Sequence, residues 1–208
     1  MSSKENNLAK LVLNGDRRAL AQAITLIEST RDNHRNQAEN LLEEILPMTG
    51  KSIRLAITGV PGVGKSTFIE TFGLHLVSEG HRVAVLAVDP TSQISGGSIL
   101  GDKTRMDKLS QSKDAFIRPT PTAGSQGGVA RRTREVMLAF EAANFDVILV
   151  ETVGVGQSEI SIENMSDTVI YCVQPGSGDT LQFMKSGIIE IPDIILATII
   201  AKLFILIP

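Results

Sequence analysis

From residue 52 onward, short apolar runs alternate with segments of helical periodicity. The runs expected to form strands cover residues 53–58, 83–89, 115–118, 147–151, 168–173 and 194–197. Several of them are continuous and β-branched, which is typical of strands buried on both faces of a parallel sheet. The segments expected to form helices cover residues 65–78, 103–110, 129–143 and 180–189. This alternation predicts an α/β fold with a doubly wound, mostly parallel sheet.

The first fifty residues differ from the rest, because their apolar positions repeat only at helical spacing. The repeating positions are Leu20, Ala23, Ile24 and Ile27, followed by Leu41, Leu42, Ile45 and Leu46. The polar stretch 30–40 between them is either a turn or the exposed start of the second helix. Asp16 is a candidate N-cap for the first helix. We therefore expect a small helical segment at 1–50, an incomplete P-loop domain at 51–197 and an atypical apolar tail at 198–208.

Composition narrows the classes of protein that this chain can represent. The 208 residues are 42% hydrophobic and 21% charged, with a formal net charge of −3, so no basic excess favours nucleic-acid binding. The single cysteine, Cys172, excludes an internal disulfide and fits a reducing compartment. The apolar run 194–207 is shorter than the roughly 20 residues that a membrane-spanning helix needs. We expect a cytoplasmic protein that binds neither nucleic acid nor membrane.

The strongest motif follows the first expected strand. It reads Gly59-Val60-Pro61-Gly62-Val63-Gly64-Lys65-Ser66-Thr67 and satisfies the pattern G-x-x-x-x-G-K-[ST] between a strand and a helix. Its glycines let the backbone N–H groups surround a phosphate chain, and the following helix begins with its positive dipole end. We expect Lys65 to reach the β- and γ-phosphates and Ser66 to bind Mg²⁺. The simpler alternative is a glycine-rich turn with a surface lysine.

Acidic residues are expected close to this loop. Asp89 ends the second strand, Glu151 ends the strand 147–151, and Asp102 lies in a long loop between them. Because ligands bind at the carboxyl ends of parallel strands, these three carboxylates and Ser66 are candidate Mg²⁺ ligands. Lys65, Asp102 and Glu151 are the candidate catalytic groups. Each acid also has a simpler reading: Asp89 as a turn residue before proline, Glu151 as a solvated strand end, and Asp102 as a helix cap.

Four stretches together resemble the ArgK/MeaB family of G proteins, which are P-loop NTPases. They are GVPGVGKSTFIETFG (59–73), DPTS with GGSILGDKTRM (within 89–106), TPTAGSQGGVARRTRE (120–135) and VETVGVGQSE (150–159). The resemblance implies a Mg²⁺-dependent GTPase that acts as a chaperone for an adenosylcobalamin-dependent methylmalonyl-CoA mutase. It places the phosphate loop on 59–67, the acids near the metal on Asp89, Asp102 and Glu151, and a segment that contacts the mutase on 154–159. The backbone N–H of Gly154 is expected to contact the γ-phosphate.

The sequence departs from the family pattern after Leu196. The family continues into an Asn-Lys-x-Asp motif whose aspartate selects guanine, whereas this chain reads Ala197-Thr198-Ile199-Ile200-Ala201-Lys202. The arm that forms the family's homodimer has no counterpart here either. We therefore expect a C-terminally truncated or frameshifted member of the family. Two alternatives stay open: a kinase or ATPase linked to arginine/ornithine transport, and a degenerate fragment that binds nucleotide without catalysis.

Overall fold

A computed structural model describes residues 3–89, 106–121, 126–152, 164–174, 192–199 and 202–206. The elements in chain order are α1 (Ser3–Leu13), α2 (Arg17–Glu28), α3 (Asp32–Ile45), η1 (Leu46–Met48), β1 (Ile53–Gly59), α4 (Lys65–Ser78), β2 (Val83–Asp89), α6 (Asp107–Ser110), β3 (Ala115–Pro121), α7 (Gln126–Ala142), β4 (Val147–Glu151), β5 (Thr168–Val173), β6 (Ile194–Ile199) and β7 (Lys202–Leu206). The helix expected at 180–189 lies outside the described residues.

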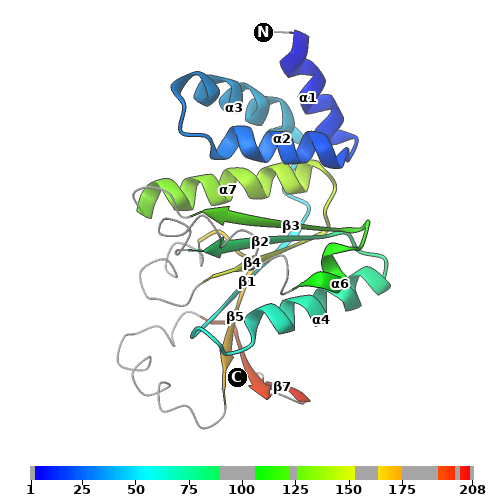
Figure 1. Ribbon diagram of the computed structural model, residues 1–208, viewed down its shortest axis with the longest axis vertical. Coiled ribbons are helices and arrows are strands. Elements are labelled where there is room, and N and C mark those ends of the chain that lie inside the picture. Colours follow the sequence, from blue (N-terminus) through cyan, green and yellow to red (C-terminus); the bar gives the residue numbers. More distant parts are fainter. Residues whose placement is uncertain are drawn as a thin grey trace.

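Within the described ranges, the strands form one sheet in the order β3-β2-β4-β1-β5-β6-β7 (Figure 1). Neighbouring strands from β3 to β6 pair in parallel, and β7 pairs antiparallel with β6. The predicted α/β fold with a doubly wound, mostly parallel sheet is therefore confirmed. Its register sets Glu151 of β4 beside Ile57 of β1, and Cys172 of β5 beside Gly59. The carboxyl ends of these strands consequently lie at one edge of the sheet.

The central strands are buried on both faces, as their continuous apolar runs predict. In β1, Ala56 belongs to a core that includes the N-terminal helices and α7, whereas Ile57 belongs to a core that includes α4 and α6. Ile148 and Leu149 of β4 divide between the two cores in the same way. Figure 1 shows α7 on one side of the sheet and α4 with α6 on the other. Successive residues of a strand point to opposite faces, so consecutive residues at the centre of these strands are apolar.

The N-terminal helices form a layer outside α7 (Figure 1). The carboxylate of Asp16 accepts a hydrogen bond from the Ala19 N–H at 2.7 Å, which confirms the predicted N-cap of α2. The helix α3 begins at Asp32, so the polar stretch 30–40 is mainly the exposed start of a helix. Sequence reasoning did not predict α1, although Ala9 and Val12 of this helix are buried in the core shared with α7. These helices therefore share one hydrophobic core with the sheet.

Helix α2 is fastened to the edge strand β3 at both ends. At its start, Arg17 donates to the Ala115 carbonyl at 2.7 Å and lies over the Phe116 ring. At its end, the Glu28 carboxylate pairs with Arg118 and accepts a hydrogen bond from the Thr120 hydroxyl at 2.9 Å. The helix therefore covers β3 from its amino end to its carboxyl end.

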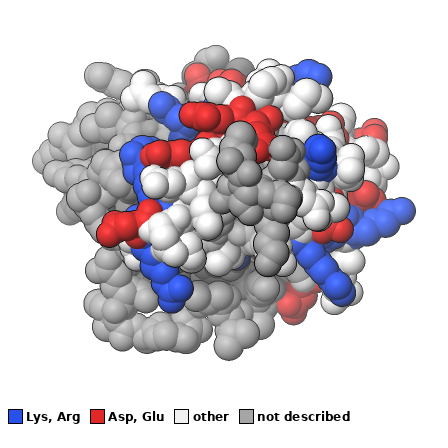
Figure 2. Space-filling model, turned by 90° about the horizontal axis from the view of Figure 1, so that it is seen from above, with Lys and Arg blue, Asp and Glu red and all other residues white. Residues whose placement is uncertain are grey.

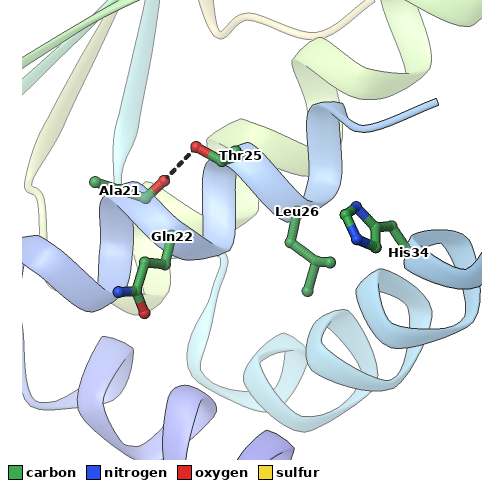
Figure 3. A pocket seen from close by; sticks show the side chains of 5 residues that line it. All are labelled: Ala21, Gln22, Thr25, Leu26 and His34. Carbon is green, nitrogen blue, oxygen red and sulfur yellow. Dashed lines mark hydrogen bonds between the residues drawn. The ribbon is translucent and has the colours of Figure 1, made fainter. Parts of the chain in front are cut away.

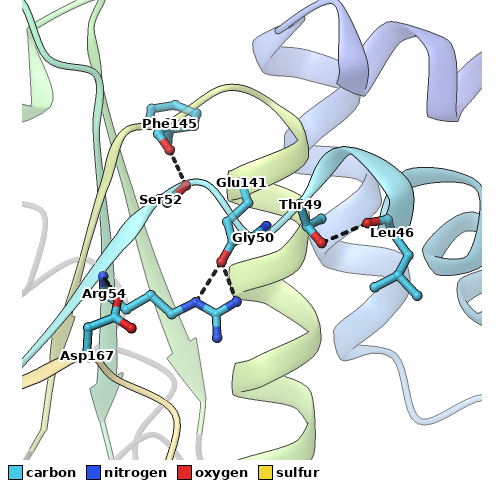
Figure 4. Close-up of polar contacts among 8 residues, drawn as sticks. All are labelled: Leu46, Thr49, Gly50, Ser52, Arg54, Glu141, Phe145 and Asp167. Carbon is cyan, nitrogen blue, oxygen red and sulfur yellow. Dashed lines mark hydrogen bonds and ion pairs between the residues drawn. The ribbon is translucent and has the colours of Figure 1, made fainter.

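A buried carboxylate joins the helical layer to the amino end of the sheet (Figure 4). Glu141 of α7 is 4% exposed, pairs with Arg54 at the start of β1, and accepts the backbone N–H of Gly50. Arg54 Nε donates to Oε1 of Glu141 at 2.6 Å. A charge removed from water needs such partners, and here the guanidinium and the amide provide them. This cluster fixes the link between η1 and β1.

The last described strands extend beyond the sequence prediction. The strand expected at 194–197 continues to Ile199, and residues 202–206 form β7 beside it.

Across the described residues, every helix is too short or too polar to cross a membrane. Figure 2, which looks onto the N-terminal helices, shows side chains of both charges interspersed on that face. Within α3, Arg35 pairs with Glu39 at 2.7 Å.

Candidate nucleotide-binding site

The loop between β1 and α4 has a backbone that only glycine adopts readily. Gly59, Gly62 and Gly64 have φ angles of +138°, +81° and +100°. Side chains with a Cβ are strained at these angles, so the three glycines let the chain fold over the start of α4. The helix begins at Lys65, directly after Gly64. The predicted phosphate loop thus has the strand–loop–helix context that its motif requires.

Packing, as well as the backbone angle, requires glycine at position 59. A Cβ at this position would collide with the carbonyl oxygen of Cys172 and would lie 3.2 Å from Cγ1 of Val63. Because β5 passes this close to the start of the loop, a hydrogen atom is the only side chain that fits. The close approach also holds the loop against the carboxyl end of β5.

Lys65 directs its ammonium group back into the loop. The residue is 7% exposed, and its Nζ donates to the carbonyl oxygens of Gly59 at 2.7 Å and Val60 at 3.1 Å. A buried ammonium needs hydrogen-bond acceptors, and the loop carbonyls supply them. The positive charge is therefore held at the centre of the loop, beside the start of α4.

Ser66 and Glu151 meet at the edge of the sheet. The Ser66 hydroxyl donates to Oε1 of Glu151 at 2.8 Å. The register of β4 explains this contact, because Glu151 pairs with Ile57 of β1 on one side and with Ala87 of β2 on the other. The carboxylate is partly buried, and it faces the first turn of α4.

The other predicted site residues are only partly described. Asp89 ends β2, the strand next to β4, so its backbone lies at the same edge of the sheet as Glu151. Its side chain is not among those described. Asp102 and Gly154 lie outside the described residues, and their predicted contacts with metal and phosphate stay predictions.

Oxygen ligands suit Mg²⁺, which usually takes few protein ligands and completes its shell with phosphate oxygens and water. The Ser66 hydroxyl and the Glu151 carboxylate are such a pair. Among the residues that the structure describes, no three His, Cys, Asp or Glu side chains gather as an independent metal site. The residues present therefore fit a metal that binds together with a phosphate ligand.

Cys172 of β5 pairs with Gly59, the first residue of the phosphate loop. Burial raises the pKa of its thiol from 9.0 to about 12; the positive charge of Lys65 lowers this pKa and the carboxylate of Glu151 raises it by smaller amounts. The thiol is therefore neutral across the physiological pH range.

Sequence reasoning missed one residue at this site. Thr198 was expected in an atypical tail, but it belongs to β6 and is 9% exposed. Its hydroxyl lies within hydrogen-bond distance of the Val63 carbonyl in the phosphate loop, and 3.1 Å from the Val173 carbonyl. No motif marks this threonine, because the contact depends on how β6 is placed beside β5.

Away from the phosphate loop, a hollow lies between α2 and α3 (Figure 3). The Thr25 hydroxyl at its wall donates a hydrogen bond within its own helix, to the Ala21 carbonyl. Nδ1 of His34 is hydrogen-bonded to the Ser29 hydroxyl at 2.7 Å. Leu26 supplies the apolar part of the lining. This hollow offers no convergent polar groups for chemistry, in contrast to the edge beside the phosphate loop.

Comparison with known proteins decides the family. The family model described as "Methylmalonyl Co-A mutase-associated GTPase MeaB" matches residues 20–201. The chain belongs to the MeaB family. The resemblance to the ArgK/MeaB group that the sequence motifs indicated is thereby confirmed.

Individual relatives agree with this assignment. A probable GTPase of Mycobacterium tuberculosis is 58% identical over 190 residues, which cover 91% of this chain and 56% of that protein. The GTPase ArgK of Escherichia coli is 52% identical over 181 residues, which cover 87% of this chain and 55% of that protein. A crystal structure described as an LAO/AO transport system kinase matches with a TM-score of 0.76 and 39% identity, over 94% of this chain and 56% of that one. This MeaB-family chain spans about half the length of the curated relatives it matches.

Proposed function

We propose that this chain binds and hydrolyses GTP with Mg²⁺, as its family description suggests. The observation that carries the proposal is the contact of Ser66 with Glu151 beside the loop that holds Lys65. A structural turn would not need a glycine-built loop, a buried ammonium and a carboxylate at one point. Nucleoside triphosphate hydrolysis uses each of these groups.

In this mechanism the loop and Lys65 bind the phosphate chain. The N–H groups of Val60 and of residues 62–67, together with the N-terminal end of α4, attract the negatively charged oxygens. The ammonium of Lys65, now on the carbonyls of Gly59 and Val60, needs only a change of side-chain conformation to reach the β- and γ-phosphates. There it stabilises the negative charge that spreads over the phosphate oxygens in the transition state.

Ser66 and Glu151 hold the metal in this proposal. Mg²⁺ held there would neutralise part of the negative charge of the phosphates. The Ser66 hydroxyl, which donates to Glu151 in this structure, would be one of the groups that hold the metal. Glu151, with Asp89 and Asp102, would hold the metal and orient the attacking water, and the Gly154 N–H would contact the γ-phosphate.

Substitution of Lys65 tests the site directly. We expect Lys65→Ala to lower the rate of GTP hydrolysis by about 100-fold or more, since it removes a preorganised charge from the transition state. The matched control is Lys51→Ala, because Lys51 is exposed before β1. Hydrolysis by Lys65→Ala at the wild-type rate would contradict the proposal.

Product analysis separates the alternative activities. Release of inorganic phosphate supports a hydrolase, whereas transfer of labelled γ-phosphate to a protein or amino-acid acceptor would favour a kinase. Nucleotide binding without Mg²⁺-dependent turnover would favour a non-catalytic role. Competition between GTP and ATP measures base preference, and equal affinity would show that the described site selects phosphate rather than guanine.

We further propose that the chain acts as a chaperone for an adenosylcobalamin-dependent methylmalonyl-CoA mutase. The support is the family description, which names association with this mutase. Residues 154–159 are the proposed contact, because they begin three positions after Glu151 and would sense the state of the phosphates. We expect the purified mutase to accelerate GTP hydrolysis by this chain. An unchanged rate at saturating mutase would contradict the chaperone proposal and leave the hydrolase proposal standing.

A further inference from the structure

We infer that Thr198 is a positioning residue for the phosphate loop, a role that rests on the nucleotide-binding function proposed above. Its hydroxyl is placed between the Val63 carbonyl of the loop and the Val173 carbonyl at the end of β5. A threonine hydroxyl carries one proton, so the two carbonyl oxygens share a single donor. Thr198 therefore links three segments that are distant in sequence: the loop, β5 and β6.

The strand register explains how Thr198 reaches the loop. Gly59 pairs with Cys172 across β1 and β5, and Ala197 pairs with Val173 across β5 and β6. Thr198 is thus the first residue of β6 beyond its last pair with β5, at the edge where the loop begins. Its Cβ would lie 3.7 Å from a Cβ built on Gly64, which is ordinary van der Waals contact. The Thr198 side chain therefore lies beside Gly64, at the end of the loop immediately before α4.

Holding the Val63 carbonyl also fixes the next amide. The peptide between Val63 and Gly64 is trans, and in a trans peptide the C=O and N–H groups point in opposite directions. While the carbonyl oxygen is held by Thr198, the Gly64 N–H points away from β6. Gly64 has a φ of +100°, where glycine is conformationally free, so this peptide needs an external restraint. Thr198 supplies that restraint and preorganises a backbone donor for phosphate.

The test compares Thr198→Val, which keeps the shape but lacks the hydroxyl, with Thr198→Ser, which keeps the hydroxyl. We expect Thr198→Val to weaken binding of GTP, ATP and inorganic triphosphate alike, by about five- to tenfold, the effect of one hydrogen bond. Thr198→Ser should bind within twofold of the wild type. The matched control is Thr71→Val in α4, whose exposed hydroxyl donates within its own helix, to the Thr67 carbonyl.

A second measurement tests the positioning role without nucleotide. In the nucleotide-free chain, amide hydrogen exchange of residues 62–65 should be faster in Thr198→Val and unchanged in Thr198→Ser. A purely structural role would instead raise exchange throughout β5, β6 and α4. If Thr198→Val does not fold, Thr198→Ala provides the same comparison.

The outcomes are distinguishable. Unchanged loop exchange and unchanged affinity in Thr198→Val would overturn the inference, as would equal losses in Thr198→Val and Thr198→Ser. If the wild-type chain binds no nucleotide, the proposed function fails, while hydrogen exchange in the loop still decides whether Thr198 restrains it.

Discussion

The hydroxyl of Ser66 donates to the carboxylate of Glu151 at 2.8 Å, although 85 residues separate them in the chain. The contact exists because β1 and β4 are neighbours in the sheet, and because both end at the edge where α4 begins. It brings a hydroxyl and an acid together beside the buried ammonium of Lys65. The predictions below start from this pair and from the packing that holds the loop.

The first prediction concerns Glu151. Replacement by glutamine keeps the size of the side chain but removes its negative charge, so it should bind a Mg²⁺-bound water poorly. We expect Glu151→Gln to lower Mg²⁺-dependent hydrolysis by about 100-fold, the scale of losing one preorganised electrostatic contact. Steady-state hydrolysis measured across a Mg²⁺ titration provides the test. Glu79→Gln at the exposed end of α4 is the control, and equal rates in both variants would contradict the role of Glu151.

The second prediction concerns Gly59. Alanine there must adopt a φ of +138° and also displace the Cys172 carbonyl, which belongs to a packed strand. We expect Gly59→Ala to lower the free energy of unfolding by about 3 kcal/mol or more, because strain and overpacking add. Gly80→Ala isolates the backbone term, since Gly80 has a φ of +91° with open space around it. That variant should lose only about 1 kcal/mol.

Urea denaturation of the two glycine variants measures both losses. A free energy of unfolding for Gly59→Ala equal to that of Gly80→Ala would show that β5 yields to the added methyl group. The close contact between Gly59 and Cys172 would then not be the reason for glycine at this position.

The third prediction concerns the buried ion pair of Glu141 with Arg54. Removing one partner leaves the other charge without compensation, so Glu141→Ala should lower the free energy of unfolding by about 3–5 kcal/mol. The comparison is Glu39→Ala, which breaks the pair with Arg35. The Arg35 side chain is 34% exposed and the Glu39 side chain is 51% exposed. This surface pair should contribute less than about 1 kcal/mol. Similar losses in the two variants would contradict the structural role assigned to Glu141.

The fourth prediction concerns the Cys172 thiol. Burial raises its pKa from 9.0 to about 12, so the folded chain keeps the thiol protonated at pH values where the unfolded chain loses the proton. The unfolded state is therefore favoured increasingly as the pH rises from about 9 to about 12. We expect the free energy of unfolding to fall over this range, and to fall less in Cys172→Ala.

Thiol reactivity checks the same cause independently. In the native chain at pH 8, a disulfide reagent should modify Cys172 slowly, and denaturant should make the reaction fast. Rapid modification of the native chain would contradict the burial of the thiol below the loop. A pH dependence identical in Cys172→Ala and in the wild type would show that other groups cause the loss of stability.

Local patterns accounted for much of the fold. The helix expected at 65–78 is found with the same bounds, as are three of the strands, because buried β-branched runs and a P-loop motif define their own limits. The helix α1 was missed because its segment is mostly polar. Among its described side chains, Ala9 and Val12 are buried and Leu8 and Leu13 are partly buried against the same core, which is a short signal.

The sequence by itself determined the fold class, the phosphate-loop motif and the family, because these depend on residue types at fixed spacings. Tertiary structure alone decided which of these residues meet. The order β2-β4-β1-β5-β6 brings Glu151 to Ser66 and Thr198 to the Val63 carbonyl, and no local spacing encodes that order. The physical reason is that strand order follows from how α4 and α7 cover opposite faces of one sheet, which is a property of the packed core as a whole.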